Sequence, residues 1–177
     1  LGSIGTWYLL DGMLHFFAIL KEKYPTAKFL FITGEKPIVI YKHLPNFNLQ
    51  KSDVHIISAA RQDVPNLLSV SDISLFFIKT SYSKIACSPT KLGEILAMGI
   101  PVIANKNVGD VAEILEQTKG GITLEQLNEN SFREAVTNIT NLLKKDAVTI
   151  RNNAKKYYDL QLGAAKYASV YQKILGK

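Results

Sequence analysis

The sequence predicts an α/β fold in which a parallel sheet of about six strands carries helices on both faces and continues into a helical carboxyl end. Short continuous apolar runs, typical of strands buried on both faces, alternate along the chain with segments whose apolar residues recur every three or four positions, typical of helices. From residue 130 onward only the helical pattern remains. This alternation implies a parallel sheet, whose ligands bind at the carboxyl ends of its strands.

The elements follow from these patterns in chain order. A first strand is expected to end at the glycine-rich turn of residues 2–5, and a helix follows with an apolar stripe from Leu9 to Leu20. Five further strands are expected at residues 29–32, 54–57, 73–78, 101–104 and 121–124. Helices are expected after Pro37, at residues 64–70, 89–98, 110–117 and 130–143, and within 157–175. Because the chain opens directly on the turn, we expect it to begin within a fold.

Length and composition set the class of protein. The 177 residues, of which 47% are hydrophobic and 20% charged, predict one globular domain spanning residues 1–177. No apolar run approaches the roughly 20 residues that cross a bilayer, and no signal peptide is visible. A single cysteine, Cys87, excludes an intramolecular disulfide and fits a reducing compartment. We therefore expect a cytoplasmic protein.

The charge balance indicates the kind of partner. A net charge of +6 favours anionic partners such as nucleotide phosphates, and it permits peripheral contact with the inner face of a membrane. Solubility alone is the alternative explanation. The positive residues are scattered, and there is neither zinc-finger spacing nor an aromatic RNA-binding signature, so nucleic acid is not an expected partner.

The densest chemical signal lies in residues 88–103, which read SPTKLGEILAMGIPVI. Ser88 suits the N-cap of a helix and Pro89 its first position, so this helix should begin in the loop after a strand. Its free N–H groups and the positive end of its dipole favour an anion there. Lys91 adds a full charge, which suits a phosphate.

One turn further along this predicted helix stands a carboxylate. Glu94 is able to accept two hydrogen bonds from the adjacent hydroxyls of a ribose. A phosphate at the helix tip and a ribose one turn away match the dimensions of a nucleotide. The alternative is an ordinary surface pair of Lys91 and Glu94, worth roughly 0.2–0.5 kcal/mol.

This stretch resembles the donor-site motif of GT-B-fold glycosyltransferases, especially the retaining group 1 family. That family carries a Glu, seven residues, a second Glu and then a Gly-x-Pro-Val-Ile ending. Glu94 stands at the second Glu, and residues 99–103 match the ending. The NVGDVAEI stretch at 107–114 resembles the family's next glycine-containing turn. The first Glu falls on Ala86, which cannot ionise, so its contact with the donor sugar is not carried over.

The resemblance implies that the chain is the Rossmann-like, C-terminal half of such an enzyme. It implies transfer of a sugar from a nucleotide-diphosphate sugar to a glycan or lipid-linked acceptor in polysaccharide biosynthesis, with no cofactor and no metal. Lys91 and Glu94 carry over as the catalytic-site pair. The implied partner is a missing N-terminal acceptor domain of the same protein, without which we expect no catalysis. The last helix, about 160–175, is expected to pack either toward that domain or on its own.

The resemblance implies further donor-binding positions. The turn formed by Gly2, Ser3, Gly5 and Thr6 should approach the donor phosphates, although a tight turn alone explains its glycines. Additional candidates are Gly34, Ser58, Lys79, Lys84, Ser88, Pro89 and Thr90. Of these, Gly34 and Ser58 end strands where the nucleotide base should lie. The two lysines are expected to meet a diphosphate, or else to be simply solvated.

Two other functions compete with this interpretation. A sugar-nucleotide 2-epimerase of the same fold would share the donor half, but it needs acid–base residues that the sequence does not identify. A non-catalytic nucleotide-binding α/β module is the second rival, and such modules usually show acidic clusters or a flavin loop. A dinucleotide dehydrogenase is disfavoured because the glycines of residues 2–5 lack the Gly-x-Gly-x-x-Gly spacing.

Overall fold

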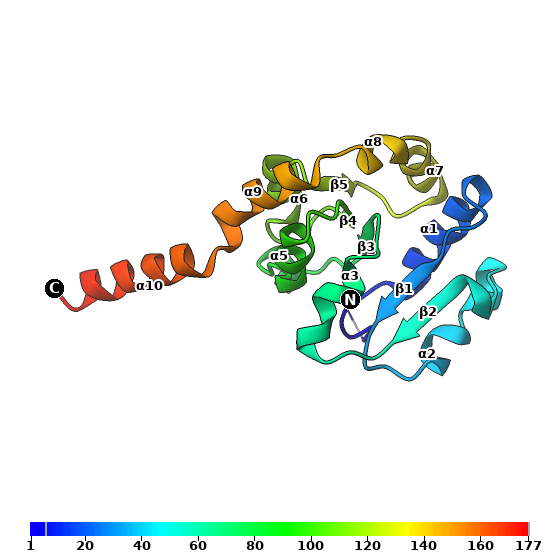
Figure 1. Ribbon diagram of the computed structural model, residues 1–177, viewed down its shortest axis with the longest axis horizontal. Coiled ribbons are helices and arrows are strands. Elements are labelled where there is room, and N and C mark those ends of the chain that lie inside the picture. The colour runs from blue at the N-terminus through cyan, green and yellow to red at the C-terminus, as the bar shows by residue number, and fades with distance from the viewer. Residues whose placement is uncertain (6, 177) are drawn as a thin grey trace.

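The computed structural model describes residues 1–5 and 7–176, and its strands form two parallel sheets (Figure 1). In the first sheet β1 (Phe29–Ile32) pairs with β2 (Val54–Ile57). In the second sheet β4 (Val102–Asn105) lies between β3 (Ser74–Phe76) and β5 (Gly121–Leu124). The five strands expected after the glycine-rich turn are all present.

The expected single sheet of about six strands is divided, because no strand among the described residues joins β1 to β3. The position expected for a first strand is represented only by the start of the chain, where the Gly2 amide donates to the Ile32 carbonyl at 2.8 Å. The α/β class and the parallel strand direction are confirmed, whereas the number of strands in one sheet is not.

The helices connect and cover these sheets. They are α1 (Leu10–Lys23), α2 (Ile38–Tyr41), α3 (Val64–Leu68), α4 (Tyr82–Ile85), α5 (Thr90–Ala97), α6 (Val111–Thr118), α7 (Glu129–Thr137), α8 (Ile139–Leu143), α9 (Ala147–Tyr158) and α10 (Leu160–Ile174). Short 3₁₀ turns occupy Leu44–Phe47, Lys51–Asp53 and Arg61–Asp63. Within a loop expected to be irregular, α4 forms an additional helical turn.

One expected helix is divided in the structure, and the last helix lies where it was expected. The helix expected over 130–143 breaks at Asn138, between α7 and α8. The helix expected within 157–175 is present as α10, and it follows Asp159, whose extended backbone ends α9. Its carboxylate accepts a hydrogen bond from the Leu162 amide at 3.0 Å and so caps α10.

An aromatic cluster lies at the centre of the core. Phe16 of α1, Phe77 at the end of β3 and Phe132 of α7 are fully buried. Phe132 lies with its ring centroid 5.6 Å from each of the other two rings. Because these residues come from distant parts of the sequence, the cluster joins the amino-terminal helix to the carboxyl-terminal helices.

The carboxyl end leaves the body of the protein. Whereas α9 packs on α5 and α6, α10 projects away from the body (Figure 1) and has no buried residue. At the end of α9 the Tyr158 ring lies against Gly93 of α5, where a Cβ would come 2.5 Å from the ring. The exposed apolar side chains of this region are Leu160, Leu162, Tyr167, Val170, Tyr171, Ile174 and Leu175. No helix within the described ranges has the length and apolar character of a membrane span.

Candidate functional site

Lys91 lies in the first turn of α5, at the carboxyl edge of the sheets, beside the glycine-rich turn. Its Nζ donates to the Leu1 carbonyl and lies 3.8 Å from the centroid of the Tyr8 ring. Gly2 has a φ of +92°, and a Cβ there would lie 3.1 Å from the Lys91 Nζ. The glycine therefore provides both the backbone conformation and the space that this close approach requires.

The surroundings of Lys91 change its titration. Burial lowers the pKa of Lys91 to about 8, and the opposing effect of the Glu94 charge is smaller. At neutral pH the ammonium is therefore still mostly protonated, but it is partly stripped of water. A cation in this condition is well suited to pair with an anion, which would replace the lost hydration.

The tip of α5 begins one residue later than the sequence predicts. The helix starts at Thr90, and Pro89 occupies the N-cap with an extended backbone, ψ 113°. Ser88 is exposed and makes no capping hydrogen bond, so its predicted N-cap role is wrong. Among the described residues, no acceptor is present for the backbone amides of Thr90 and Lys91. The predicted open helix tip is thus present with a different cap.

Glu94 is on the outer side of α5, as its spacing predicted, while Leu92 and Ile95 face the core. Its side chain is 42% exposed and accepts a hydrogen bond from Arg61 Nη2 at 3.2 Å. The guanidinium of Arg61 is almost fully exposed. Sequence reasoning singled out Ser58 of this loop but not the Arg61 side chain. Ser58, in the same loop, is exposed.

A cavity adjoins the glycine-rich turn. Ser3 Oγ donates to Glu35 Oε1 at 2.9 Å and accepts from the Gly5 amide at 3.1 Å, which ties the turn to the loop after β1. The cavity measures about 320 Å³ and is lined by residues 1–3, 32–35, Ala59 and Val64, so Gly34 borders it. Thr6, also predicted in this site, lies outside the described residues.

The two loop lysines lie around Trp7 rather than around Lys91. The Nζ of Lys84 is 4.2 Å from the centroid of the Trp7 ring, and the exposed Lys79 donates its backbone amide to the Trp7 carbonyl at 2.8 Å. No contact within residues 1–5 and 7–176 joins either ammonium to Lys91. Trp7 and Tyr8 were missed in the sequence, although an aromatic pair directly after a glycine-rich turn is a visible signal.

The loop before α5 is held by a close backbone approach. Gly109 has a φ of +45°, and a Cβ there would come 2.2 Å from the Cys87 carbonyl oxygen. Its amide donates to the Lys84 carbonyl at 2.9 Å. The glycine-containing turn after β4 therefore fixes the segment that leads into the tip of α5. No group of three His, Cys, Asp or Glu side chains in the described part of the chain is placed to hold a metal ion.

The fold is similar to parts of solved glycosyltransferases. WaaG, a glycosyltransferase involved in lipopolysaccharide biosynthesis, matches with a TM-score of 0.69 and 22% identity over 92% of this chain and 43% of WaaG. TarM of S. aureus, in a complex that includes UDP, matches with a TM-score of 0.70 and 17% identity over 96% of this chain and 34% of TarM. The GtfA/B complex matches with a TM-score of 0.73 and 14% identity over all of this chain and 36% of the matched chain.

The chain therefore spans less than half the length of each of these three proteins. A comparison with curated protein sequences finds no match. The family model for glycosyl transferases group 1 matches residues 2–141, which include the glycine-rich turn, α5 and the turn at Gly109. The match covers most of the sequence and agrees with the fold, and the chain accordingly belongs to the group 1 glycosyl transferases.

Proposed function

We propose that this chain is the donor-binding half of a retaining glycosyltransferase that moves a sugar from a nucleotide-diphosphate sugar to a glycan or lipid-linked acceptor. The observation that carries the proposal is the position of Lys91. At this position a partly desolvated ammonium lies beside the free amides at the tip of α5 and the close backbone of Gly2. This combination of donors suits the phosphates of a nucleotide.

In this proposal each group has a defined task. The ammonium of Lys91 and the amides of Thr90 and Lys91 stabilise the negative charge that grows on the departing nucleoside diphosphate as the bond to the sugar breaks. Glu94, one turn along α5, accepts hydrogen bonds from the ribose hydroxyls. No metal or cofactor is assigned a task, because protein cations and helix amides neutralise the phosphates.

The cavity of about 320 Å³ beside Gly34 supports the placement of the nucleotide base. It opens at the carboxyl ends of β1 and β2, next to the turn that borders Lys91. Backbone groups of residues 33–35 and the loop of Ser58 would contact the base there. Lys79 and Lys84, which lie around Trp7, are proposed to meet the outer end of the diphosphate-sugar.

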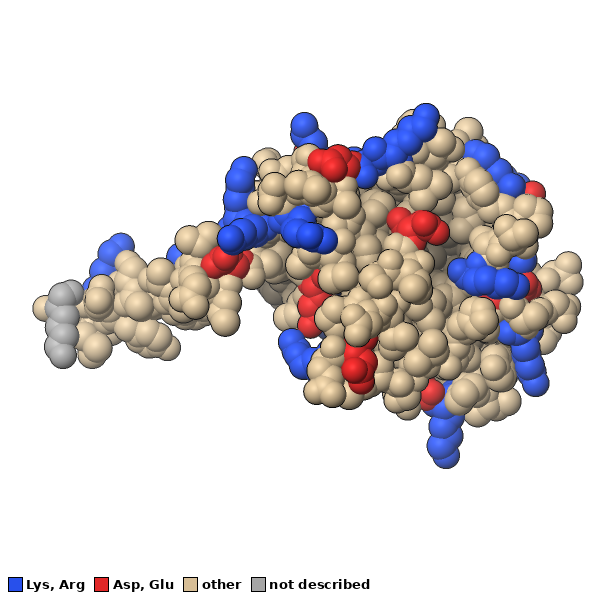
Figure 2. Space-filling view, viewed as in Figure 1, with Lys and Arg blue, Asp and Glu red and all other residues tan. Residues whose placement is uncertain are grey.

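The acceptor and the remaining catalytic groups belong, in this proposal, to an N-terminal domain of the same protein. This chain covers only 43% of WaaG and 34% of TarM, and this partial coverage supports a longer parent enzyme. The exposed apolar side chains of α10 support contact with such a domain. We place the parent enzyme in the cytoplasm, with peripheral contact at the inner face of the membrane through its basic surface, where Lys and Arg are spread over the visible face (Figure 2).

The test is calorimetric titration of UDP, GDP, ADP and CMP, and of their sugars, into the chain and its variants. One nucleotide should bind, and Lys91→Met should lower its affinity at least tenfold because the phosphate loses its contact with a desolvated cation. Glu94→Gln should lower the affinity for the nucleotide but not the affinity for inorganic diphosphate, which has no ribose.

Lys144→Met and Glu116→Gln are the matched controls, since both side chains are exposed and neither residue belongs to α5. They should leave affinity unchanged. Equal losses in Lys91→Met and Lys144→Met would mean that nucleotide binding reflects net charge alone, and the proposed site would be wrong.

A further inference from the structure

A helix outside the region that the family model matches holds α5 along one side. This helix is α9, which packs on α5 and runs antiparallel to it. Gly99, just after α5, has a φ of +75°, and a Cβ there would come 2.7 Å from the carbonyl oxygen of Ala147 at the start of α9. One turn later the Arg151 guanidinium donates to the carbonyls of Ala97 at 2.9 Å and Met98 at 3.4 Å. A cation thus pairs with the last carbonyls of α5, where the helix dipole favours it.

The other end of α9 lies against the middle of α5. The Tyr158 ring covers Gly93, where a Cβ would come between 2.5 and 2.9 Å from three atoms of the ring. Glycine at this position therefore permits the close approach of the two helices. Gly93 stands two residues after Lys91, which places the two positions about 200° apart around the helix. Tyr158 thus supports α5 on the side away from Lys91.

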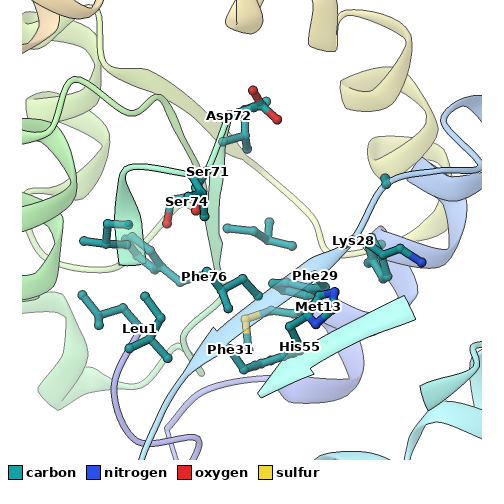
Figure 3. A pocket seen from close by; sticks show the side chains of 18 of the residues that line it. Leu1, Met13, Lys28, Phe29, Phe31, His55, Ser71, Asp72, Ser74 and Phe76 are labelled. Atoms are coloured by element: carbon teal, nitrogen blue, oxygen red, sulfur yellow. The ribbon is translucent and has the colours of Figure 1, made fainter. Parts of the chain in front are cut away.

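The side of α5 that carries Lys91 is less closely packed. Lys91 borders a cavity of about 670 Å³ between β1 and β3. Its walls are mainly apolar, and Phe29, Phe31 and Phe76 lie among them (Figure 3). Atoms that face a cavity lose packing contacts on that side. The contacts that α9 makes from the opposite side therefore carry a larger share of the positioning of the α5 tip.

The Tyr158 side chain ends in a polar atom that the fold leaves unpaired. Its hydroxyl oxygen is buried and has no hydrogen-bond partner among the described residues. Burial of a hydroxyl without a hydrogen bond is unfavourable, and buried polar atoms are nearly always paired. Phenylalanine would make the same ring contact with Gly93 without this penalty. Departures of this kind from the rules of folding are expected at functional sites.

Two polar side chains lie near this hydroxyl. Burial raises the pKa of Tyr158 to about 12, and the negative charge of Asp110 adds to the shift. The Ser88 side chain opposes the shift, which places it beside the phenol, although the two groups do not meet the geometry of a hydrogen bond. The phenol is therefore protonated at neutral pH, and its proton is available to an acceptor.

These two neighbours mark the entry to α5. Asp110 stands at the N-cap of α6, and Ser88 lies two residues before Thr90, the first residue of α5. The turn before Asp110 touches the same segment, since a Cβ on Gly109 would lie 3.4 Å from the Ser88 nitrogen. The Tyr158 hydroxyl thus lies where α9, the start of α6 and the segment leading into α5 meet. The free amides at the tip of α5 begin two residues beyond Ser88.

We propose that Tyr158 is a positioning residue of the donor site, whose hydroxyl is unpaired in the free protein and donates to the Ser88 hydroxyl when a phosphate binds at the tip of α5. The inference rests on the donor-binding function proposed above. The new bond fixes the residues before Thr90 while the amides of the tip hold the phosphate. Because this bond forms only in the bound state, it contributes to affinity and not to the stability of the free protein.

The test measures affinity and stability in the same variants. Inorganic diphosphate and the nucleotides are titrated by calorimetry into Tyr158→Phe. Affinity for diphosphate and for the bound nucleotide should fall roughly threefold to tenfold, the range expected for one hydrogen bond. The melting temperature without ligand should stay equal or rise, because the lost hydroxyl had no partner. Tyr157→Phe is the matched control, since it removes a hydroxyl from the exposed neighbouring tyrosine, and it should change neither quantity.

A double-mutant cycle tests the assigned partner. Ser88→Ala should lower the affinity for diphosphate by a similar factor, and the double variant with Tyr158→Phe should show no further loss. Additive losses would overturn the assignment to Ser88. A melting temperature that falls together with affinity in Tyr158→Phe would show that the hydroxyl is already paired in the free protein, which also overturns the proposal.

The parent chain separates this inference from the proposed function. Nucleotide or diphosphate binding by the parent chain that Tyr158→Phe leaves unchanged refutes the role of the hydroxyl alone. Absence of any such binding by the parent chain refutes the donor-binding function, and the role of Tyr158 is refuted with it.

Discussion

The ammonium of Lys91 lies 3.8 Å from the centroid of the Tyr8 ring, at the point where the glycine-rich turn meets the tip of α5. A ring face attracts a cation but supplies none of the hydrogen bonds that water would give. The pair therefore holds the ammonium in place while leaving it short of acceptors. Occupation of these free donor positions by a phosphate is the basis of the first prediction.

Nucleotide affinity should fall as pH rises through about 8. In the free protein the lowered pKa means that Lys91 is about nine-tenths protonated at pH 7 and about one-tenth at pH 9. A phosphate binds the protonated form, so the apparent Kd should increase up to about tenfold between pH 7.5 and pH 9. Calorimetry across this range checks the effect. Lys91→Arg should remove the pH dependence, and a persisting slope in that variant would assign the titration to another group.

The contact between Arg61 and Glu94 should contribute little to stability. Both side chains are exposed, and such surface pairs are typically worth about 0–1 kcal/mol. Arg61→Ala should therefore leave the melting temperature within a few degrees of the parent chain. A double-mutant cycle with Glu94→Gln, measured by urea denaturation, should give a coupling below about 1 kcal/mol. A larger coupling would show that the pair has a structural role that its exposure does not indicate.

Gly109→Ala should destabilise the loop that leads into α5. The left-handed backbone disfavours alanine by about 1–3 kcal/mol, and the new Cβ would collide with the Cys87 carbonyl. In a chain of this length we expect the melting temperature to fall by roughly 2–12 °C. Gly163→Ala is the matched control, since nothing lies within 4 Å of its Cβ position. Equal effects of the two substitutions would contradict the close approach at Gly109.

Phe132→Ala should be among the most damaging single substitutions. The ring is fully buried against Phe16 and Phe77, and removal of a core phenylalanine typically costs about 3–5 kcal/mol. Urea denaturation should show this loss as a lower midpoint with an unchanged slope. Tyr167→Ala removes an aromatic ring that is 72% exposed and should change stability by less than about 1 kcal/mol. A small loss for Phe132→Ala would place the centre of the core elsewhere.

Periodic patterns predicted those parts of the fold that depend on local sequence. The five strands appear where continuous apolar runs stand, and α5 buries Leu92 and Ile95 while exposing Glu94. These features follow from the geometry of a single element. The start of α5 was misplaced by one residue because Ser88 has the statistical preference of an N-cap, whereas Pro89 occupies that position in the structure.

The parts that the sequence did not predict depend on the tertiary arrangement. Arg61 approaches Glu94 from a loop 33 residues away, and Trp7 meets Lys84 from a distant part of the sequence. Neither contact leaves a spacing pattern. The roles of the predicted site residues stay predictions until the titrations above are made.

The contact between Tyr158 and Gly93 has a mechanical consequence. The ring at the end of α9 rests on the middle of α5, one residue from Glu94 and two from Lys91. One residue further along the chain, Asp159 begins the projecting helix α10. Because α10 follows directly on this contact, we expect movements at the base of α10 to reach the helix that holds both charged groups.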